Sequence, residues 1–521
     1  MSTFEPQVPA SPRATILARN SLANLVRATS SSATNILLPV LLVVTLAPAA
    51  YASWALVWTL GTFVAYFDLG VPTTVQAIVG SHSEDGHSRS AVRAVRSGLL
   101  ITSVVAALAI SAAAVMGMSI GAVFPAMPIE YRWSAVLALA LIVLGQASTL
   151  VSNVASSYFA GNQRSYVPAF VLTPTRYVAM AAAWIAAWIS QSLFVAALAY
   201  AVPLVVGGLV LLWLFTREVR VETAPVDDVT DWGRASNYSV TGLLRHSGPL
   251  IIWSLCMLVI TGAGLVIVGR LDFASVATYS IAAVVVGALA GLESASSAPF
   301  LPELARIHTK HGATEVSRLV LRFTSINSLL LFAATAAVMT FGPFLFSLLG
   351  RGARIDESLG LICLALLMLG SAIHLSGTPL SLAFIASRTH TRVVAQPVLQ
   401  AIMTLLLSLV GGLSYGAAGV AAGVFLGGCL GICLTVFWSS RAAGVANDEP
   451  FHLLAVAALK PVACLIPVIA CLVITAVGHV PTNGATLSLS ILCLTVSLLF
   501  LVRTGLSKAD RVMLRRRLLR R

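Results

Sequence analysis

The chain has 521 residues, of which 58% are hydrophobic and only 10% are charged. Soluble globular proteins carry about 25% charged residues, so this composition excludes an ordinary soluble enzyme or binding domain and indicates a polytopic membrane protein. The net charge of +13 does not require a nucleic-acid partner, because lysine and arginine accumulate in the cytoplasmic loops of membrane proteins.

Apolar runs long enough to cross a bilayer recur along the whole chain. They predict an all-α membrane protein with about 14 transmembrane helices. The N-terminal residues lack the compact apolar core of a signal peptide, so we expect them to stay in the cytosol. The predicted spans cover residues 20–46, 51–79, 91–117, 132–158, 166–189, 191–216, 241–266, 274–301, 318–346, 358–385, 392–411, 416–440, 457–479 and 485–503.

The basic residues set the predicted orientation. Two of the 32 lysines and arginines lie within spans, and four lie in connections on the predicted outside: Arg132, Arg270, Arg351 and Arg354. The others fall on the opposite side, which places both termini in the cytosol by the positive-inside rule. We therefore expect a multi-pass protein of the cytoplasmic (inner) membrane.

A charged, turn-rich segment divides the chain near its middle and has the composition of a linker. The predicted order is an N-terminal lobe of six spans, a cytoplasmic linker, a C-terminal lobe of six spans, two additional spans and a basic cytoplasmic tail. These parts cover residues 1–216, 217–240, 241–440, 441–503 and 504–521.

The second predicted span carries one carboxylate, Asp68, directly before Gly70 and Pro72. An acidic side chain at mid-helix costs roughly 2.5–3.5 kcal/mol on insertion scales, so such residues usually face a water-filled cavity or a partner. Irregular backbone at membrane depth is tolerated where it lines such a cavity. We expect this helix to line a central cavity, with Asp68 acting in coupling or recognition, or else holding helices together.

The C-terminal half repeats this pattern. Tyr279 begins an apolar run that contains one acid, Glu293, and ends at a proline, as Tyr51 begins the run that contains Asp68. Repeated halves are common in transporters, which hold the substrate between them. Glu293 is therefore a candidate for coupling to a proton or cation, or else a structural buried group.

Two arginines lie within predicted spans. Arg27 lies in the polar strip NSLANLVRATSSSATN of the first span. Three interpretations are open: its side chain extends to the membrane interface, it pairs with Asp68, or it forms a cationic site for phosphate. A guanidinium binds phosphate through two parallel hydrogen bonds. Arg176 lies near the middle of the fifth span, just after Pro174. From this depth its guanidinium would have to extend a long way to reach the membrane interface.

Two further residues of the spans are weaker functional candidates. Arg245 opens the seventh span and is expected at the membrane interface. His374 is central in the tenth span, where it either hydrogen-bonds to a neighbouring side chain or takes part in a proton relay. The seven cysteines lie in apolar runs without CxxC spacing, so neither a disulfide framework nor a metal site is expected. Close helix packing is predicted by glycines at every fourth position of the twelfth span, namely Gly419, Gly423, Gly427 and Gly431.

Motifs for ATP binding and for hydrolytic chemistry are absent from the sequence. There is no GxxxxGK[ST], no HExxH and no nucleophile elbow. We therefore expect a transporter rather than an enzyme, without a cofactor and driven by an ion gradient or by the gradient of its substrate.

The layout resembles the polysaccharide-flippase (O-antigen type) family of the multidrug/oligosaccharidyl-lipid/polysaccharide (MOP) exporter superfamily. The resemblance covers most of the chain and rests on the span pattern, on YASWALVWTLGTFVAYFDLGV after a polar first helix, on YSIAAVVVGALAG followed by APFLPELARIH, and on the AGNQRSYVPAF loop. It implies two six-helix lobes around a central cavity plus two further helices. It also implies translocation of an undecaprenyl-pyrophosphate-linked oligosaccharide for O-antigen, capsule or exopolysaccharide synthesis.

In that family, cavity arginines are thought to receive the pyrophosphate and sugar. The resemblance gives this role to Arg27, with Arg176 as a candidate by depth, and places Asp68 in the polar cavity lining. The implied partners are the lipid-linked oligosaccharide, a proton or sodium ion, membrane lipids and, as candidates, other membrane proteins of polysaccharide assembly. Further candidates for coupling or for the cavity wall are Glu293, His374 and Arg245.

Two alternatives remain open at this point. A multidrug/cation antiporter of the same superfamily would favour an acidic cavity and twelve spans. A membrane polymerase or ligase of lipid-linked glycans would need a sizeable outside loop with catalytic residues, and the predicted outside connections are short.

Overall fold

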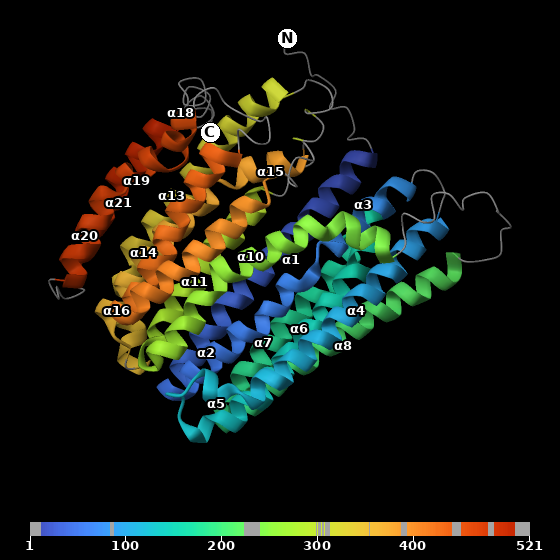
Figure 1. Ribbon diagram of the computed structural model, residues 1–521, viewed down its shortest axis with the longest axis horizontal. Coiled ribbons are helices and arrows are strands. Elements are labelled where there is room, and N and C mark those ends of the chain that lie inside the picture. Colours follow the sequence, from blue (N-terminus) through green and yellow to red (C-terminus); the bar gives the residue numbers. More distant parts are fainter. Residues whose placement is uncertain are drawn as a thin grey trace, which may run out of the picture.

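A computed structural model describes residues 12–83, 88–222, 240–297, 300, 304, 307, 313–353, 355–386, 393–439, 450–477 and 484–505. Within these ranges the chain is helical and contains no strand. Long helices run side by side in one bundle, with α5 at one end and α3 and α15 toward the other (Figure 1). We call these the α5 end and the α15 end. Helices of this kind bond most of their backbone N–H and C=O groups internally, as hydrocarbon surroundings require.

The first half of the bundle is built around α6, which packs against α2, α3, α4 and α8, while α7 packs against α8 and α1. Its last helix, α8, runs past the predicted span end at residue 216, and residues 223–239 of the predicted linker lie outside the described part. The elements are α1 (Pro12–Thr45), α2 (Pro48–Thr62), the 3₁₀ helix η1 (Phe63–Asp68), α3 (Val71–Ser83), α4 (Ser88–Met118), α5 (Ile120–Val123), α6 (Ile129–Gly161), α7 (Tyr166–Ser190) and α8 (Leu193–Glu222).

The second half is built around α14 and α16. Helix α16 packs against α10 and α14, and α14 also packs against α11 and α13. The elements are α10 (Val240–Leu271), η3 (Phe273–Ser275), α11 (Val276–Ser297), α13 (Ala313–Ala353), α14 (Glu357–Leu375), α15 (Thr378–Ala386), α16 (Ala395–Cys433) and the π-helical turn η5 (Leu434–Ser439). The two halves meet where α1 and α2 pack against α11 and where α2 and η1 pack against α10.

The C-terminal helices pack against α13. Ser328 Oγ donates to the carbonyl of Ala457 at 3.0 Å, and Ser325 Oγ donates to the carbonyl of Gly505. Residues 506–521, most of the predicted basic tail, lie outside the described part. These helices are α18 (Pro450–Leu454), η6 (Ala455–Leu459), α19 (Lys460–Cys464), α20 (Ile466–Val477) and α21 (Gly484–Gly505).

The predicted second span is broken beside its carboxylate. Leu69 and Gly70 both have left-handed backbone, with φ of 56° and 66°, which ends η1 before α3 begins. Asp68 Oδ1 accepts the backbone N–H of Gly70 at 3.1 Å. The irregular backbone predicted here is confirmed, and the carboxylate stabilises the break itself by a local turn.

Helix α16 folds back on itself at Tyr415 and Gly416, where the backbone leaves the helical conformation. The glycines of its second half then face the first half at contact distance. A Cβ on Gly427 would lie 2.8 Å from Thr404 Cβ, and one on Gly431 would lie 2.6 Å from Gln400 Oε1. The predicted packing role of this glycine ridge is confirmed, because only a hydrogen at these positions lets the two halves approach so closely.

We expect Gly423→Ala to lower the melting temperature of the purified protein. Its Cβ would meet the backbone of Ser408 and lie 2.6 Å from the carbonyl carbon of Leu407, so the hairpin must open, at a cost of about 1–3 kcal/mol. Gly80→Ala is the matched control, because its Cβ would meet the carbonyl oxygen of Gly161 at an ordinary 3.8 Å. Equal melting temperatures for both variants would contradict the packing assignment.

The number of spans is only partly settled by length and hydropathy. Within the described residues, 11 helices are long and apolar enough to cross a membrane, or 12 if the bent pair Phe451–Cys464 and Ile466–Thr475 forms one span. The range Ala395–Trp438 counts once there although α16 folds back within it. Fourteen spans therefore stays a prediction, while a multi-pass membrane protein is shown.

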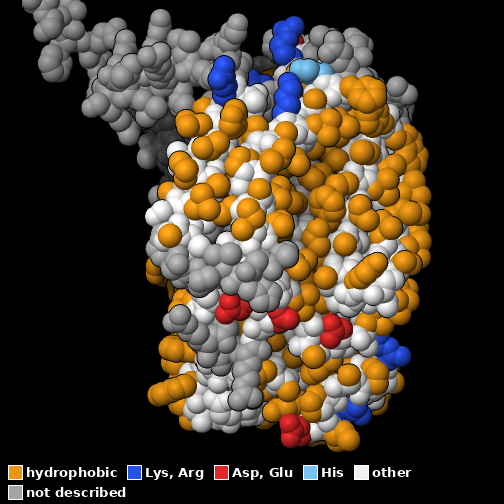
Figure 2. Space-filling view, turned by 90° about the vertical axis from the view of Figure 1, so that its left-hand side faces the viewer, with side chains coloured by type: hydrophobic (Ala, Val, Ile, Leu, Met, Phe, Trp, Pro, Cys, Tyr) orange, Lys and Arg blue, Asp and Glu red, His pale blue; other side chains and the backbone are white. Residues whose placement is uncertain are grey.

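Hydrophobic side chains cover the body of the bundle between its charged ends. In Figure 2, lysine and arginine side chains stand at the upper end of the visible face and again at its lower right, and acidic side chains lie in its lower part. Large apolar side chains of the outer helices, such as Phe170 and Leu413, are exposed on the surface and therefore require apolar surroundings such as lipid. This surface matches a protein embedded in a bilayer.

Candidate functional site

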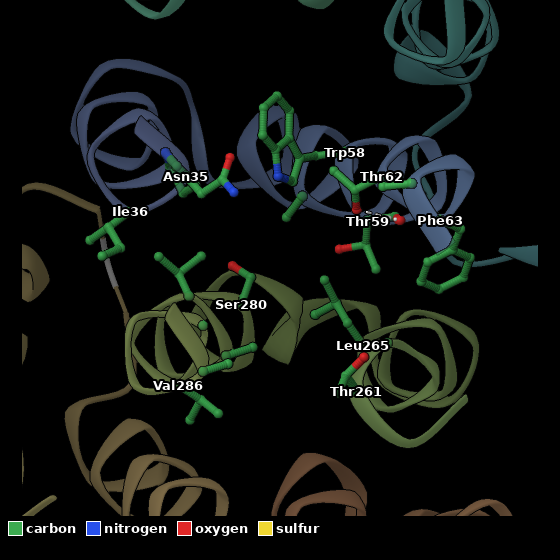
Figure 3. A pocket seen from close by; sticks show the side chains of 18 of the residues that line it. Asn35, Ile36, Trp58, Thr59, Thr62, Phe63, Thr261, Leu265, Ser280 and Val286 are labelled. Atoms are coloured by element: carbon green, nitrogen blue, oxygen red, sulfur yellow. Dashed lines mark hydrogen bonds between the residues drawn. The ribbon is translucent and has the colours of Figure 1, made fainter. Parts of the chain in front are cut away.

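A cavity of about 550 Å³ lies between the two halves of the bundle. Its walls come from α1, α2, η1, α6, α7 and α8 on one side and from α10, α11, α14 and α16 on the other. Figure 3 shows side chains of α1 and α2, among them Asn35 and Trp58, facing side chains of α10 and α11 such as Thr261 and Ser280. The volume is in the range of about 300–1,000 Å³ typical of small-ligand pockets.

The N-terminal half provides a polar wall. Gln146, Thr149 and Asn153 recur at intervals of three and four residues and so share one face of α6, which looks into the cavity. Helix α1 adds Asn35 to this wall. Further polar lining residues of this half are Ser31, Thr34, Thr59 and Thr62.

Arg176 is the one fully charged side chain among the described lining residues, and these residues include no carboxylate. It lies two residues after Pro174 in α7 and is close enough to Tyr200 for electrostatic interaction. The Tyr200 hydroxyl in turn accepts from Gln146 Nε2 at 3.5 Å. Since no ion pair to Arg176 occurs within the described ranges, its donors are available to a ligand, and the cavity has a fixed positive charge.

Aromatic rings extend the same wall. Trp54 and Trp58 stack with centroids 5.9 Å apart, and Trp58 meets Tyr200 edge to face at 4.8 Å. Trp54 Nε1 is buried without a hydrogen-bond partner among the described atoms. Flat apolar faces beside a cation and many hydroxyls form a surface for a ligand that has both ring faces and polar edges.

The opposite wall, from the C-terminal half, is mostly apolar. Its lining includes Leu265, Val286 and Leu375 together with glycines, and its few polar groups are Thr261, Tyr279, Ser280, Ser371 and His374. The two walls therefore differ in character: one is polar and cationic, and the other is apolar with isolated hydrogen-bonding groups.

The two halves touch at the α5 end of the cavity. Ser280 Oγ donates to the Tyr51 hydroxyl at 3.2 Å, and Arg270 Nη1 donates to the carbonyls of Ala122 and, at 3.0 Å, Val123. Nearby, a Cβ on Gly269 would lie 2.9 Å from Leu56 Cδ1. These contacts join α2 and α5 to α10 and α11 and close this end.

The structure brings Arg27 near Arg176 but not near a counter-charge. The two guanidinium groups interact electrostatically, and Arg27 is not among the residues that line the cavity. No ion pair joins Arg27 to Asp68 in the part of the chain described. Two cations within electrostatic range of one another repel unless an anion lies between or beside them.

The two acidic candidates, Asp68 and Glu293, are not among the residues that line the cavity. Asp68 is held in the turn described above. Glu293 is 7% exposed, accepts from Ser297 Oγ, and is also hydrogen-bonded by Thr378. The two acids thus have different surroundings, although Tyr51 and Tyr279, which begin the repeated pattern, both line the cavity.

His374 lines the cavity from α14, and its Nδ1 lies 2.9 Å from Gln400 Nε2. Arg245 belongs to α10, but its side chain lies outside the described part. Sequence reasoning missed the aromatic residues Trp54, Trp58 and Tyr200. It also missed the polar stripe of α6, whose helical spacing within an apolar span was a readable signal.

A cysteine at position 59 tests whether the cavity is hydrated. In a variant lacking the seven native cysteines, we expect Thr59→Cys to react with a water-soluble thiol reagent on the order of tenfold faster than Ala135→Cys. Thr59 lines the cavity, whereas Ala135 is fully buried in α6. The measurement is the rate of mass shift in purified protein, and equal rates would show that water does not enter.

No protein-family model and no curated protein matches the sequence. Among solved structures, the chain is similar to the lipid II flippase MurJ in an inward closed conformation, with TM-score 0.66, 13% identity, and coverage of 93% of this chain and 98% of that chain. It is similar to an inward-facing multidrug resistance MATE family transporter, with TM-score 0.60, 13% identity, and coverage of 80% and 95%.

A third similar structure is a MOP superfamily transporter from Pyrococcus furiosus, described as having a binding pocket of reverse polarity that suggests a different function. It has TM-score 0.58 and 15% identity, with coverage of 82% of this chain and 96% of that chain. These similarities confirm the predicted all-α membrane fold with two lobes, and they extend over nearly the full length of each compared structure. The chain has the fold of the MOP superfamily transporters.

Proposed function

We propose that the protein translocates an undecaprenyl-pyrophosphate-linked oligosaccharide across the cytoplasmic membrane for surface polysaccharide synthesis. A diphosphate with several sugars cannot cross roughly 30 Å of hydrocarbon unaided. A polar cavity inside a bundle lowers that barrier for the headgroup, while the lipid tail stays in the bilayer.

The observation that carries the proposal is the charge of the cavity. Arg176 lines it without a carboxylate among the described lining residues, and a guanidinium offers the planar donors that bind phosphate through two hydrogen bonds. Arg27 adds a second positive charge within electrostatic range. A pyrophosphate placed between them would relieve their repulsion.

The aromatic and hydroxyl groups suit the remainder of such a headgroup. The ring of Trp58, which meets Tyr200 edge to face, can pack against the C–H face of a sugar ring, and the α6 stripe offers amide and hydroxyl groups to the edge of that ring. The volume of about 550 Å³ favours a short oligosaccharide over a long polymer.

Transport would follow from rocking of one lobe against the other, so that the cavity opens to each side in turn. With both termini in the cytosol, the α5 end faces outward, and the contacts of Tyr51 with Ser280 and of Arg270 with α5 close the outer side in this conformation. We further propose coupling to a proton or sodium gradient and cooperation with other membrane proteins of polysaccharide assembly.

A multidrug/cation antiporter is the second candidate, favoured by the similarity to MATE transporters. Its expected substrates are cations, which Arg176 would repel inside a cavity of low dielectric. We therefore rank the flippase first. A glycan polymerase or ligase is the third candidate, and the similar structures named above are transporters rather than enzymes.

Deletion of the gene in its host tests the proposal. We expect loss of a surface polysaccharide and accumulation of its lipid-linked precursor on the cytosolic leaflet, both reversed by the intact gene. Unchanged polysaccharide together with increased sensitivity to cationic drugs would support the antiporter instead. A precursor that reaches the outer leaflet but is not polymerised or attached would support the enzyme.

A further inference from the structure

His374 belongs to a chain of side-chain hydrogen bonds that runs from the protein interior to the cavity. Gln396 Nε2 donates to Gln400 Oε1 at 3.1 Å, and Gln400 Nε2 lies 2.9 Å from His374 Nδ1. The two glutamines are 4% and 0% exposed, whereas the histidine lines the cavity. Two buried amides thus hold one imidazole that faces the space between the lobes.

This chain predicts which ring nitrogen carries the proton. The Gln400 carbonyl oxygen is engaged by Gln396, so the Gln400 amide nitrogen faces the ring and can only donate. His374 Nδ1 must then accept, which leaves the proton on Nε2. Protonation of Nδ1 would set two N–H groups against one another, so the arrangement favours a neutral ring.

The glycine ridge of α16 makes room for this arrangement. A Cβ on Gly431 would lie 2.6 Å from Gln400 Oε1 and would also strike the amide nitrogen. Any larger residue at this position displaces the Gln400 amide. Gly431 thereby positions Gln400, and Gln400 positions the histidine.

The neutral donor stands on the wall opposite the cation. Arg176 comes from α7 in the first lobe and His374 from α14 in the second. The other titratable side chains among the described lining residues are tyrosines, on α2, η1, α8 and α11. A ligand that engages both walls therefore needs an anionic group at one end and an uncharged oxygen at the other.

We propose that His374 is a specificity residue that donates from Nε2 to an uncharged sugar oxygen of the headgroup, with Gln400 and Gly431 as positioning residues. This inference rests on the proposed function, since it assigns the anionic group to the pyrophosphate bound by Arg176. A neutral donor at this position favours a headgroup that carries a sugar over one that does not. A cation at the same position would instead raise the affinity for phosphate. A headgroup bound to both lobes would also link binding of the sugar to the movement of one lobe against the other.

The tautomer is tested by nitrogen-15 NMR of the purified protein carrying labelled histidine. The protein has nine histidines, so the signals of His374 are identified as those that are missing from the His374→Gln variant. We expect a neutral ring at pH 7 with the proton on Nε2, and a mixture of tautomers in Gln400→Leu. A proton on Nδ1, or a charged ring at pH 7, would overturn the proposal regardless of what the protein transports.

Binding of soluble headgroup analogues tests the specificity. We use uridine diphosphate N-acetylglucosamine, a sugar pyrophosphate, and uridine diphosphate, which keeps the nucleoside and the diphosphate but lacks the N-acetylglucosamine. His374→Phe should weaken binding of the sugar-bearing probe about 2- to 10-fold and leave uridine diphosphate unchanged, with Gly431→Ala giving a similar pattern. His452→Phe, at an exposed position of helix α18, is the matched control.

The outcomes separate this inference from the proposed function. If Arg176→Gln weakens both probes but His374→Phe changes them equally or not at all, the role of His374 is wrong and the anion site stands. If Arg176→Gln changes neither probe, or the unaltered protein binds neither, the proposed function fails and the inference fails with it.

Discussion

Replacing Arg176 with glutamine is expected to slow translocation of a lipid-linked saccharide by a factor on the order of 100. Removal of a buried, hydrogen-bonded charge from its ionic partner costs about 2–5 kcal/mol, and the partner here would be the pyrophosphate. Arg176 is the one fully charged side chain among the described lining residues, so no neighbour on the cavity wall replaces it. The measurement is the initial rate of flipping of a fluorescent polyprenyl-diphosphate saccharide in proteoliposomes.

Two further variants sharpen this prediction. Arg176→Lys keeps the charge but loses the planar donors, so it should retain part of the rate. Arg217→Gln is the matched control, since Arg217 packs over the ring of Trp213 near the end of α8 and does not line the cavity. A normal rate in Arg176→Gln, or an equal loss in Arg217→Gln, would contradict the role of the cavity cation.

Cross-linking the lobes at the α5 end is expected to abolish transport. Leu56 of α2 is fully buried, and a Cβ on Gly269 of α10 would lie 2.9 Å from its Cδ1, so these two positions are in direct contact across the lobes and are the pair chosen for an engineered disulfide. With the native cysteines replaced, oxidation of Leu56→Cys/Gly269→Cys should stop flipping, because the lobes can no longer separate. Reduction should restore it, and flipping is measured before and after each treatment.

The control for this experiment is a cross-link within one lobe. A Cβ on Gly98 of α4 would lie 3.0 Å from Val154 Cγ1 of α6, so Gly98→Cys/Val154→Cys joins two helices of the first half. Oxidation of this pair should leave transport largely intact. If the cross-link between lobes also leaves it intact, then rocking at the α5 end is not the transport motion.

Much of the fold was readable from the sequence because a bilayer imposes strong rules on each segment. Most of the predicted spans overlap long apolar helices of the described part, and the glycine ridge and the break beside Asp68 were both anticipated from residue chemistry. The turn at Gly416 also separates the two predicted spans on either side of it. Helix boundaries such as the end of α8 were less accurate, because amphipathic ends continue beyond the apolar core.

The site was less predictable, because hydropathy does not state which face of a helix meets which neighbour. Arg27, Arg176 and Asp68 looked alike as charges within spans, yet Arg176 lines the cavity while Asp68 is held in a local turn. The pairing of Gln400 with His374 joins positions 26 residues apart. Such contacts depend on how helices pack against one another, which periodicity alone does not give.

The charge preference of transport tests the central claim most directly. Proteoliposomes containing the unaltered protein are supplied, in separate experiments, with a polyprenyl-diphosphate saccharide and with a lipophilic cationic dye, and movement of each across the bilayer is recorded. We predict protein-dependent flipping of the anionic saccharide that is lost in Arg176→Gln, and no protein-dependent movement of the dye. Movement of the dye without flipping of the saccharide would contradict the account.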